Sequence, residues 1–281
     1  MDTELARTFL AIVESGSFGD AADRLHLTQS TVSSRMQRLE RTLGAALFVR
    51  NKAGASLTAA GRQFQRHASL LIRTVEQARQ EIGIVSGYRA TLSIGGRFGL
   101  WENLLLRWLP TFRALVPDIG IRATIGFEDE LMPALVEGRI DIAVLYTPQA
   151  RPGLTIEPLI EEQLVMVSSG RHAPAAPGRD YVYVDWGPEF RAHHSNAFPD
   201  YTGSGLAVNI GWLGLQHVLA SGGAGYFPAR LTRALELAGR VHRVADAPAF
   251  RLPAYLCFAT KMQTEALTLA VDTIRRVAAD I

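Results

Sequence analysis

The chain of 281 residues is predicted to begin with a small helical domain that carries a β-hairpin, to continue as one long helix, and to end in a two-lobed α/β domain. Three observations predict this order. Apolar residues recur every three or four positions over residues 3–43, the same spacing continues over residues 58–86, and from Thr91 short apolar runs alternate with helical segments. A content of 48% hydrophobic and 20% charged residues is typical of a folded protein, and this length allows two or three domains.

The first two helices are separated by a glycine. Residues 3–15 form the first helix, Gly16 ends it, and Ser17 is a suitable N-cap for the next one. In that second helix one face is apolar at spacings of three and four, and a break follows at His26-Leu27. The apolar face consists of Phe18, Ala21, Ala22 and Leu25.

The third helix begins after the N-cap Thr28, ends near Gly44, and has one apolar and one polar face. Its apolar stripe consists of Val32, Met36, Leu39 and Leu43. The polar face carries small hydroxyls, an amide and several guanidinium groups. A helix in the DNA major groove needs such groups, because glutamine pairs with adenine, arginine pairs with guanine, and short side chains let the backbone approach closely.

A short hairpin follows, with a strand over 47–50, a turn over 51–55 and a return strand over 56–58. Basic side chains on such a hairpin can reach the minor groove or flanking phosphates. Together with the third helix, it gives a set of candidate DNA contacts. These are Ser17, Thr28, Gln29, Ser30, Thr31, Ser33, Ser34, Arg35, Arg38, Arg50 and Lys52.

The charge distribution agrees with binding of nucleic acid. Residues 24–66 hold eight basic residues and one acid, Glu40. Residues 1–90 carry a net charge of +4, whereas the rest of the chain carries −2. Positive charge is therefore concentrated where phosphates would lie. The alternative is a small helical bundle whose basic face is only solvated.

The long helix, from Thr58 to about Ser86, carries an apolar seam spaced 4, 3, 4, 3, 4. Packing on the chain's own second domain is one interpretation, but so regular a seam favours pairing with a second copy. Two recognition helices held at a fixed separation would bind a two-fold DNA site. Gly83 and Gly87 predict a hinge near residues 83–91. The seam residues are Phe64, Ala68, Leu71, Val75, Ala78 and Ile82.

The remainder alternates strands and helices, which indicates parallel strands. In the first lobe we expect strands at 91–96, 121–127 and 140–146, with helices over 100–115 and 130–138. A crossing strand over 154–169 leads to a second lobe. That lobe is expected to contain strands at 182–186, 207–211 and 254–259, a helix over 213–222, a turn over 223–228, and a loop that includes residues 185–201. The final helix, 263–279, returns to the first lobe.

The first 65 residues resemble the N-terminal domain of LysR-type transcriptional regulators. The matching segments are LARTFLAIVESGSFGDAADRLHLTQSTVSSRMQRLERTLGAALFVR and SLTAAGRQF, with VEGRIDIAVLY and SGGAGYFPARL as more diffuse matches. The resemblance implies a winged helix-turn-helix over 1–58, a linker and dimerisation helix with its hinge over 59–90, and a periplasmic-binding-protein-like effector domain over 91–281. Lobe I would comprise about 91–163 and 262–281, and lobe II about 164–261. It also implies a homodimer or homotetramer. One departure is Ser33-Ser34, where the family commonly has Ser then Arg.

In a two-lobed domain of this kind a small-molecule effector binds between the lobes, at carboxyl ends of strands and N-termini of helices. Free amides after the first strand, together with Arg97, would attract an anion. Many members of the family have a hydroxyl residue where Gly99 stands, so Arg97 compensates or the ligand differs. Glu128 and Asp129 either reduce the positive charge or cap the following helix. The candidate effector contacts are Gly96, Arg97, Phe98, Gly99, Phe127, Glu128, Tyr146, Thr147 and Gly223.

The sequence predicts no catalytic, cofactor or metal site. No nucleophile elbow, P-loop, zinc helix or dinucleotide fingerprint is present, and the paired His193 and His194 are expected to face solvent from a loop. The lone Cys257 is expected to be buried, and a single cysteine is consistent with a reducing cytosol. No run of 18 apolar residues exists and the N-terminus lacks the features of a signal peptide, so we expect a cytoplasmic protein without a membrane span.

Two functions remain open on these grounds. One is an oligomeric regulator that binds promoter DNA and responds to an effector. The other is a cytosolic solute-binding module whose basic N-terminal helices serve only for oligomerisation.

Overall fold

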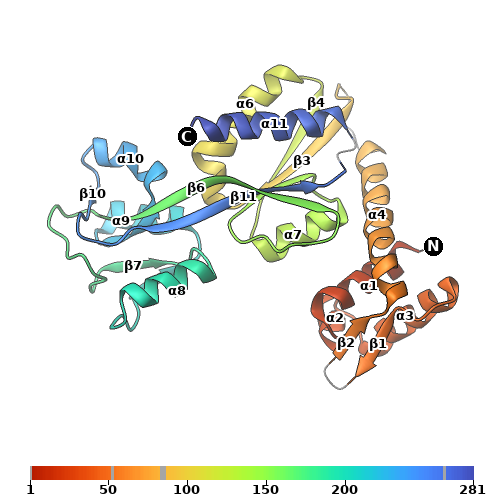
Figure 1. Cartoon of the computed structure of the whole chain (residues 1–281). Helices are drawn as coiled ribbons and strands as arrows, with labels where there is room; N and C mark the ends of the chain where they lie inside the picture. The colour runs from red at the N-terminus through yellow and green to blue at the C-terminus, as the bar shows by residue number, and fades with distance from the viewer. Residues whose placement is uncertain (1, 52–53, 83–86, 262–263) are drawn as a thin grey trace.

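The computed structural model describes residues 2–51, 54–82, 87–261 and 264–281 (Figure 1). An N-terminal domain at one end is joined by a long helix to an elongated two-lobed domain, and the termini lie on different parts of the molecule. The elements of the N-terminal part are α1 (Thr3–Ser15), α2 (Phe18–Arg24), α3 (Gln29–Leu43), β1 (Phe48–Asn51), β2 (Gly54–Leu57) and α4 (Ala59–Ile82).

The predicted boundaries of the first three helices are confirmed, because the capping residues have the geometry that their types favour. Gly16 and Gly44 end α1 and α3 with φ of 71° and 68°, in the left-handed region that glycine tolerates. The hydroxyls of Ser17 and Thr28 accept backbone N–H groups at 3.0 and 3.2 Å. The apolar stripe of α3 is buried except for Leu43, which is 40% exposed because the helix extends past the core at its last residue.

Aromatic rings form the core of the N-terminal domain. Phe9 packs against Phe48 and Phe64 with ring centroids 5.2 and 5.0 Å apart. Ala68 and Ile72 of α4 are buried in the same core.

This core corrects the predicted dimer seam at its first two positions. Phe64 and Ala68 pack inside their own chain, because the same face of α4 that carries them lies against α1. Farther along the helix, Leu71 and Val75 are half-buried and Ala78 is exposed. The side chain of Ile82 lies outside the described residues, as do residues 83–86 of the predicted hinge.

Lobe I has the predicted parallel strands. Its strands are β3 (Ala90–Gly96), β4 (Ile119–Ile125) and β5 (Ile142–Leu145), with β3 parallel to both neighbours. Its helices are α6 (Leu106–Leu115), α7 (Glu128–Glu137) and α11 (Glu265–Ala279). The last helix returns to this lobe as expected, where the indole N–H of Trp108 donates to the Thr273 hydroxyl at 2.8 Å.

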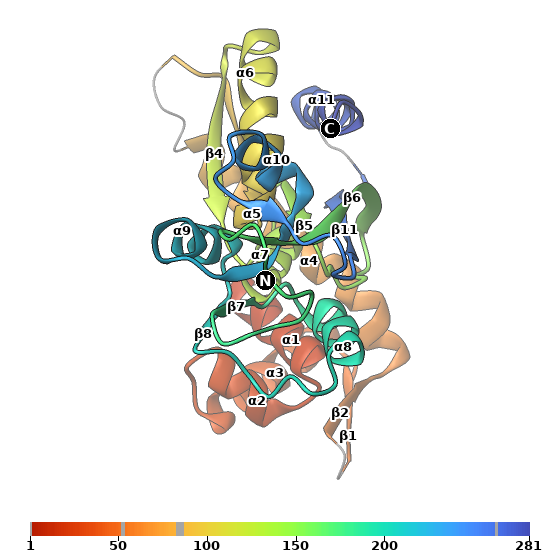
Figure 2. The same ribbon diagram turned by 90° about the vertical axis from the view of Figure 1, so that its left-hand side faces the viewer.

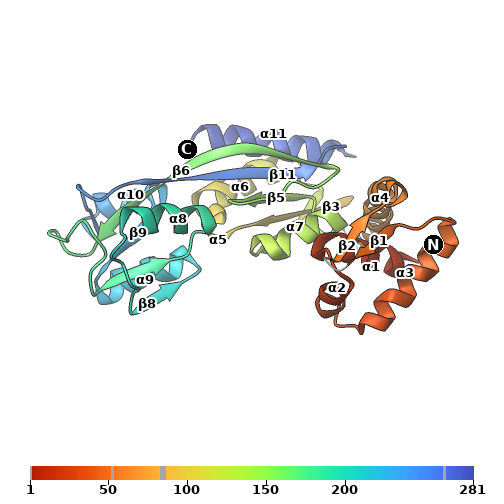
Figure 3. The ribbon, with the colours of Figure 1, turned by 60° about the horizontal axis from the view of Figure 1, so that its bottom comes forward.

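Two long antiparallel strands, β6 (Leu154–Ser168) and β11 (Phe250–Ala259), run from one lobe to the other (Figures 1 and 3). These two strands join the strands of both lobes into a single curved sheet of order β4-β3-β5-β11-β6-β9-β7-β8, with β10 paired to β6. The elements of lobe II are β7 (Tyr181–Val184), α8 (Pro188–Ala197), β8 (Leu206–Val208), α9 (Gly211–Ser221), β9 (Ala224–Pro228), α10 (Ala229–Leu237) and β10 (His242–Arg243).

Three predictions for the second lobe were wrong. The expected turn over 223–228 is largely strand β9, which pairs with β6 and β7 and is fully buried. The expected strand over 254–259 is confirmed as a strand, but it is the part of the crossover strand β11 that pairs with β5 in lobe I, so its assignment to the second lobe was wrong. Residues 188–197 form a helix, in which His194 is buried among aromatic rings and its Nε2 lies 3.0 Å from the Tyr181 hydroxyl. His193 is exposed, as expected.

The predicted helix over 100–115 is interrupted. A short α5 (Phe98–Leu100) leads into a π-type turn (Trp101–Leu105), within which Glu102 has ψ of 125° and Asn103 has φ of 58°. A regular helix would use the Gly99 and Glu102 carbonyls internally. Here both accept hydrogen bonds from Arg230 of α10, which explains the break.

None of the described helices is both long and apolar enough to cross a bilayer.

Candidate nucleic-acid interface and effector cleft

The polar face of α3 is open to solvent. Gln29, Ser30, Ser34 and Arg38 are exposed, and Ser33 is half-buried beside them. Figures 1 and 3 show α3 on the side of the N-terminal domain that faces away from both lobes. The amide, hydroxyl and guanidinium groups of these residues are therefore presented on one helix, an arrangement that fits a major groove.

The turn that precedes α3 sets the angle between the two helices. His26 has φ of 54°, and the Leu27 N–H donates to the Ala22 carbonyl at 2.9 Å, which closes the C-terminus of α2. Thr28 then caps α3, and its hydroxyl also lies 2.8 Å from that of Thr31. The hydroxyls of Ser17, Thr28 and Thr31 thus have structural roles, although Thr28 stays exposed.

Arg35 lies differently from the other candidates. Its guanidinium donates to the Glu4 carboxylate at 3.3 Å and to the Thr8 hydroxyl at 3.2 Å, so it points back toward α1. This residue was predicted to lie on the DNA-facing surface because it lies outside the apolar stripe of the helix. In the structure, Arg38 is the arginine of α3 that is both exposed and near the centre of the helix.

The hairpin is held against α3 by Glu40, the one acid of residues 24–66. Its carboxylate accepts the backbone N–H groups of Leu47 at 2.7 Å and of Phe48 at 3.4 Å. Arg50 lies over the Phe18 ring, 3.6 Å from its centroid, and remains exposed. Lys52, the other predicted contact on the hairpin, lies outside the described residues.

Between the lobes, Arg97 and Glu128 form the centre of a polar site. Arg97 follows β3 and donates to the Glu128 carboxylate at 3.0 Å, while its guanidinium lies 4.2 Å from the centroid of the Phe127 ring. The other Glu128 oxygen accepts the backbone N–H groups of Tyr146 at 3.2 Å and Thr147 at 3.3 Å. Arg97 is therefore paired within the protein and is not a free positive charge.

Two cavities adjoin this pair. A wide one of about 920 Å³ has a lining that includes Arg97, Phe127, Glu128 and Thr147 from lobe I, Asp185 and Asn209 from lobe II, and Glu14 and Arg24 from the N-terminal domain. A narrow one of about 30 Å³ lies beside it and has room for about one water molecule. It is lined by residues that include Phe98, Gly99, Tyr146, Trp186 and Ile210.

Close packing beside the narrow cavity favours glycine at position 99. A Cβ atom there would lie 3.2 Å from the Tyr146 hydroxyl and 3.7 Å from the Trp186 ring. A serine would therefore press on Tyr146, which is buried and whose hydroxyl donates to Glu162 at 3.4 Å. Burial, together with Glu162, raises the pKa of Tyr146 well above its ordinary value, so this hydroxyl stays protonated.

Two predicted effector contacts do not lie in the cleft. A Cβ at Gly96 would lie within 3.5 Å of Leu105 and Trp101, so this residue packs against the interior of lobe I. Gly223 accepts the Ser169 N–H at 3.0 Å, at the end of β6 that lies farthest from lobe I. The backbone requires glycine at position 223, because φ is 109° and a Cβ would lie 2.2 Å from the Asp180 carbonyl oxygen.

A buried ion pair joins the lobes, and no sequence pattern predicted it. Arg230 of α10 donates to both oxygens of Glu162 on β6 and to the carbonyls of Gly99 and Glu102 in lobe I. Among the described residues, one buried carboxylate oxygen of Glu102 has no hydrogen-bond partner, and burial raises the pKa of Glu102. The residues come from segments far apart in the chain, so no local motif marks them.

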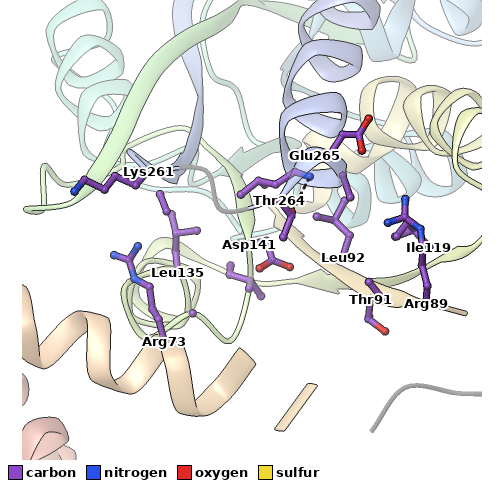
Figure 4. A pocket seen from close by; sticks show the side chains of 16 residues that line it. Arg73, Arg89, Thr91, Leu92, Ile119, Leu135, Asp141, Lys261, Thr264 and Glu265 are labelled. Atoms are coloured by element: carbon purple, nitrogen blue, oxygen red, sulfur yellow. Dashed lines mark hydrogen bonds between the residues drawn. The ribbon is translucent and has the colours of Figure 1, made fainter. Parts of the chain in front are cut away.

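A further cavity of about 180 Å³ lies where the linker helix meets lobe I (Figure 4). Arg73 of α4, Lys261 after β11 and Thr264 at the start of α11 surround it, and Asp141 lies deeper. The Asp141 carboxylate accepts the Ser93 N–H at 2.7 Å, yet burial raises its pKa to about 6.

We expect Asp141→Asn to flatten part of the pH dependence of stability. The folded state raises the pKa of Asp141 above its unfolded value of roughly 4, so its favourable contribution is complete below that value and is lost as pH rises through about 6. Between pH 5 and 8 the wild-type chain should lose about 1–2 kcal/mol more than the variant. Urea unfolding at several pH values measures this difference, and parallel curves for the two proteins would contradict it.

The chain resembles known regulators along its whole length. A family model described as "Bacterial regulatory helix-turn-helix protein, lysR family" matches residues 3–62, and one described as "LysR substrate binding domain" matches residues 86–279. The HTH-type transcriptional regulator HdfR of Salmonella newport (strain SL254) is 31% identical over 260 residues, which cover 91% of each chain.

Solved structures share the fold. ArgP from Mycobacterium tuberculosis superposes with a TM-score of 0.60 at 24% identity, covering 100% of this chain and 98% of that one. Full-length CbnR complexed with its target DNA superposes with a TM-score of 0.51 at 22% identity, covering 99% of this chain and 100% of that one.

Proposed function

The chain belongs to the LysR family of bacterial transcriptional regulators, and from this membership we propose which of its surfaces bind DNA, effector and a second copy. It is a DNA-binding regulator with an effector-binding domain, not an enzyme. The interpretation as a solute-binding module without DNA binding is therefore wrong.

We propose that α3 enters the major groove, with Gln29, Ser30, Ser33, Ser34 and Arg38 toward the bases. The observation that carries this proposal is that these side chains, all exposed except the half-buried Ser33, lie on one helix at the side of the N-terminal domain that faces away from both lobes. A second set of residues at the ends of the helices and on the hairpin would contact phosphates. This set consists of Ser17, Thr28, Thr31, Arg50 and Lys52. Arg35 would position α3 through Glu4 and Thr8.

A small-molecule effector is proposed to bind in the wide cavity between the lobes. Arg97, Phe127, Glu128 and Thr147 line it, whereas Phe98, Gly99 and Tyr146 border the narrow cavity beside it. Such a ligand would touch both lobes and so favour one angle between them. Effector binding would be coupled to DNA binding because the angle between the lobes would alter the geometry of the bound operator.

The oligomer is proposed to be a homodimer or homotetramer in which α4 pairs with a second copy. Leu70 is 50% exposed on this helix, and Ala78 is exposed farther along it. Leu71, Val75 and Ile82 would complete the contact. The proposed domains are 1–58, 59–90 and 91–281, the last divided into lobe I (91–163 and 262–281) and lobe II (164–261).

A cytoplasmic location is also proposed. Cys257 is buried, and burial raises the pKa of its thiol to about 12, so the thiol is unreactive and consistent with a reducing compartment. DNA binding requires access to the chromosome, which in a bacterium lies in the cytoplasm.

A footprint on the DNA that flanks the protein's own gene tests the proposed function. We expect two protected half-sites whose centres are separated by about one helical turn of 10 base pairs, or a multiple of it. The logarithm of the affinity should fall linearly with the logarithm of the salt concentration. Equal affinity for that DNA and for unrelated duplexes, without a protected region, would contradict sequence-specific binding.

A further inference from the structure

We infer that Glu128 is an internal ligand of the effector cleft, and that an effector bearing a carboxylate binds by displacing it. The inference rests on the proposed effector site and names the chemical class of its ligand. In this arrangement the chain supplies its own anion when no effector is present.

The groups around Glu128 are those that would bind a ligand carboxylate. One oxygen accepts from the Arg97 guanidinium at 3.0 Å, and the other accepts two backbone N–H groups, of Tyr146 at 3.2 Å and Thr147 at 3.3 Å. The two amides follow the carboxyl end of β5, where ligands of α/β domains bind. These three donors make an anion site in which every donor already has a partner.

The donors are fixed, whereas the carboxylate can leave. Two of them are backbone amides, and Arg97 lies over the Phe127 ring with its side chain only 11% exposed. Glu128 is the first residue of α7, its side chain is 21% exposed, and it borders the wide cavity of about 920 Å³. A displaced Glu128 would therefore enter solvent at little cost, while the remaining donors would need a new anion.

Charge selects the class of ligand. A neutral molecule that moved Glu128 aside would leave the largely buried Arg97 without an anion, which is unfavourable. A carboxylate restores both the charge pair and the two amide hydrogen bonds. Competition with an internal carboxylate also lowers the apparent affinity for small carboxylates, so only a ligand with further contacts in the cavity would displace Glu128 effectively.

The helix that carries Glu128, α7, lies between the rest of lobe I and the DNA-binding domain, where it contacts α4 (Figures 2 and 3). At its other end Val136 is buried in the N-terminal core, and its carbonyl accepts from Arg73 of α4 at 3.0 Å. Glu137 pairs with Arg7 of α1 at 3.1 Å. The ten residues of α7 span about 15 Å. Displacement of Glu128 would therefore release the first turn of a short helix whose last turn contacts α1 and α4.

Chemical rescue of the full-length protein tests the inference, with acetate as the probe. We expect Glu128→Ala to bind acetate about tenfold or more tightly than the wild type, and acetate to raise its melting temperature more than chloride at equal ionic strength. If the alanine variant folds poorly, Glu128→Gln takes its place in the test. The glutamine keeps an acceptor for the amides but carries no charge, so acetate should again raise the melting temperature more than chloride does. The matched control is Glu189→Ala, an exposed acid in the first turn of α8 that lines neither cavity, and it should behave as the wild type.

Two further measurements make the test decisive. Adding Arg97→Met to Glu128→Ala should remove the acetate response, and acetate should change the DNA affinity of Glu128→Ala but not that of the wild type. The ligand inference is overturned if acetate and chloride shift all variants alike, or if the response survives without Arg97. Because acetate binding is measured without DNA, its outcome is independent of whether the footprint supports the proposed function.

Discussion

Replacing Gln29, Ser33 and Arg38 together with alanine is expected to weaken operator binding by roughly 100-fold or more. A good bidentate contact to a base contributes about 1–3 kcal/mol of discrimination, and the amide of Gln29 and the guanidinium of Arg38 can each make one. The side chains of Gln29 and Arg38 are exposed, so their removal leaves the core of Val32, Met36 and Leu39 intact. Fluorescence anisotropy at fixed salt measures the affinity, and thermal unfolding shows whether the fold is retained.

The control for loss of positive charge is Arg113→Ala, an exposed arginine of α6 in lobe I. It should leave both affinity and salt dependence close to those of the wild type. Arg35→Ala should weaken binding and also lower stability slightly, since this guanidinium bonds to Glu4 and Thr8. Unchanged affinity of the triple variant for the operator would mean that α3 is not the recognition helix.

The N-terminal domain was predictable because its signals are local. Ser17, Gly16, Thr28 and Gly44 each act on a helix end within a few residues of themselves, so their types alone placed the boundaries. The alternation of strands and helices in lobe I was predictable for the same reason.

The seam of the long helix shows where periodicity stops being informative. Spacing shows that a face of α4 is buried, but not what covers it. The face that carries Phe64 and Ala68 packs against α1 of the same chain, while the exposed Leu70 lay outside the predicted stripe. Sequence periodicity alone could not separate an internal core from an interface between copies.

The cleft could be predicted only in part, because its contacts join distant segments. Arg97, Glu128 and Thr147 were proposed from their positions after strands, and they line the wide cavity together with Phe127. That Glu128 neutralises Arg97 depends on a contact between residues 31 positions apart, which no local pattern encodes. Glycine was a poor guide to the cleft, since Gly96 and Gly223 are required by close packing and by backbone conformation elsewhere.

Replacing Arg230 with methionine is expected to destabilise the protein by about 3–5 kcal/mol, the usual cost of breaking a buried ion pair by removing one partner. The side chain of Glu162 is only 3% exposed and would be left as an uncompensated charge in the interior. The carbonyls of Gly99 and Glu102 would lose their donor as well, so the break after α5 would lose its support. Urea unfolding of the full chain measures the change in free energy.

A double-mutant cycle with Glu162→Gln separates the cost of the uncompensated Glu162 charge from the cost of losing the hydrogen bonds of Arg230 to lobe I. If the buried charge causes most of the loss, the double variant should be more stable than Arg230→Met alone by about 2 kcal/mol, because neutral glutamine needs no cation. The hydrogen bonds from Arg230 to lobe I are lost in both proteins, so the remaining deficit reports on the connection between lobes. Arg251→Met, which removes an exposed arginine paired with Glu161 on the same two crossover strands, should cost less than about 1 kcal/mol. Equal losses for Arg230 and Arg251 would show that the buried pair does not hold the lobes together.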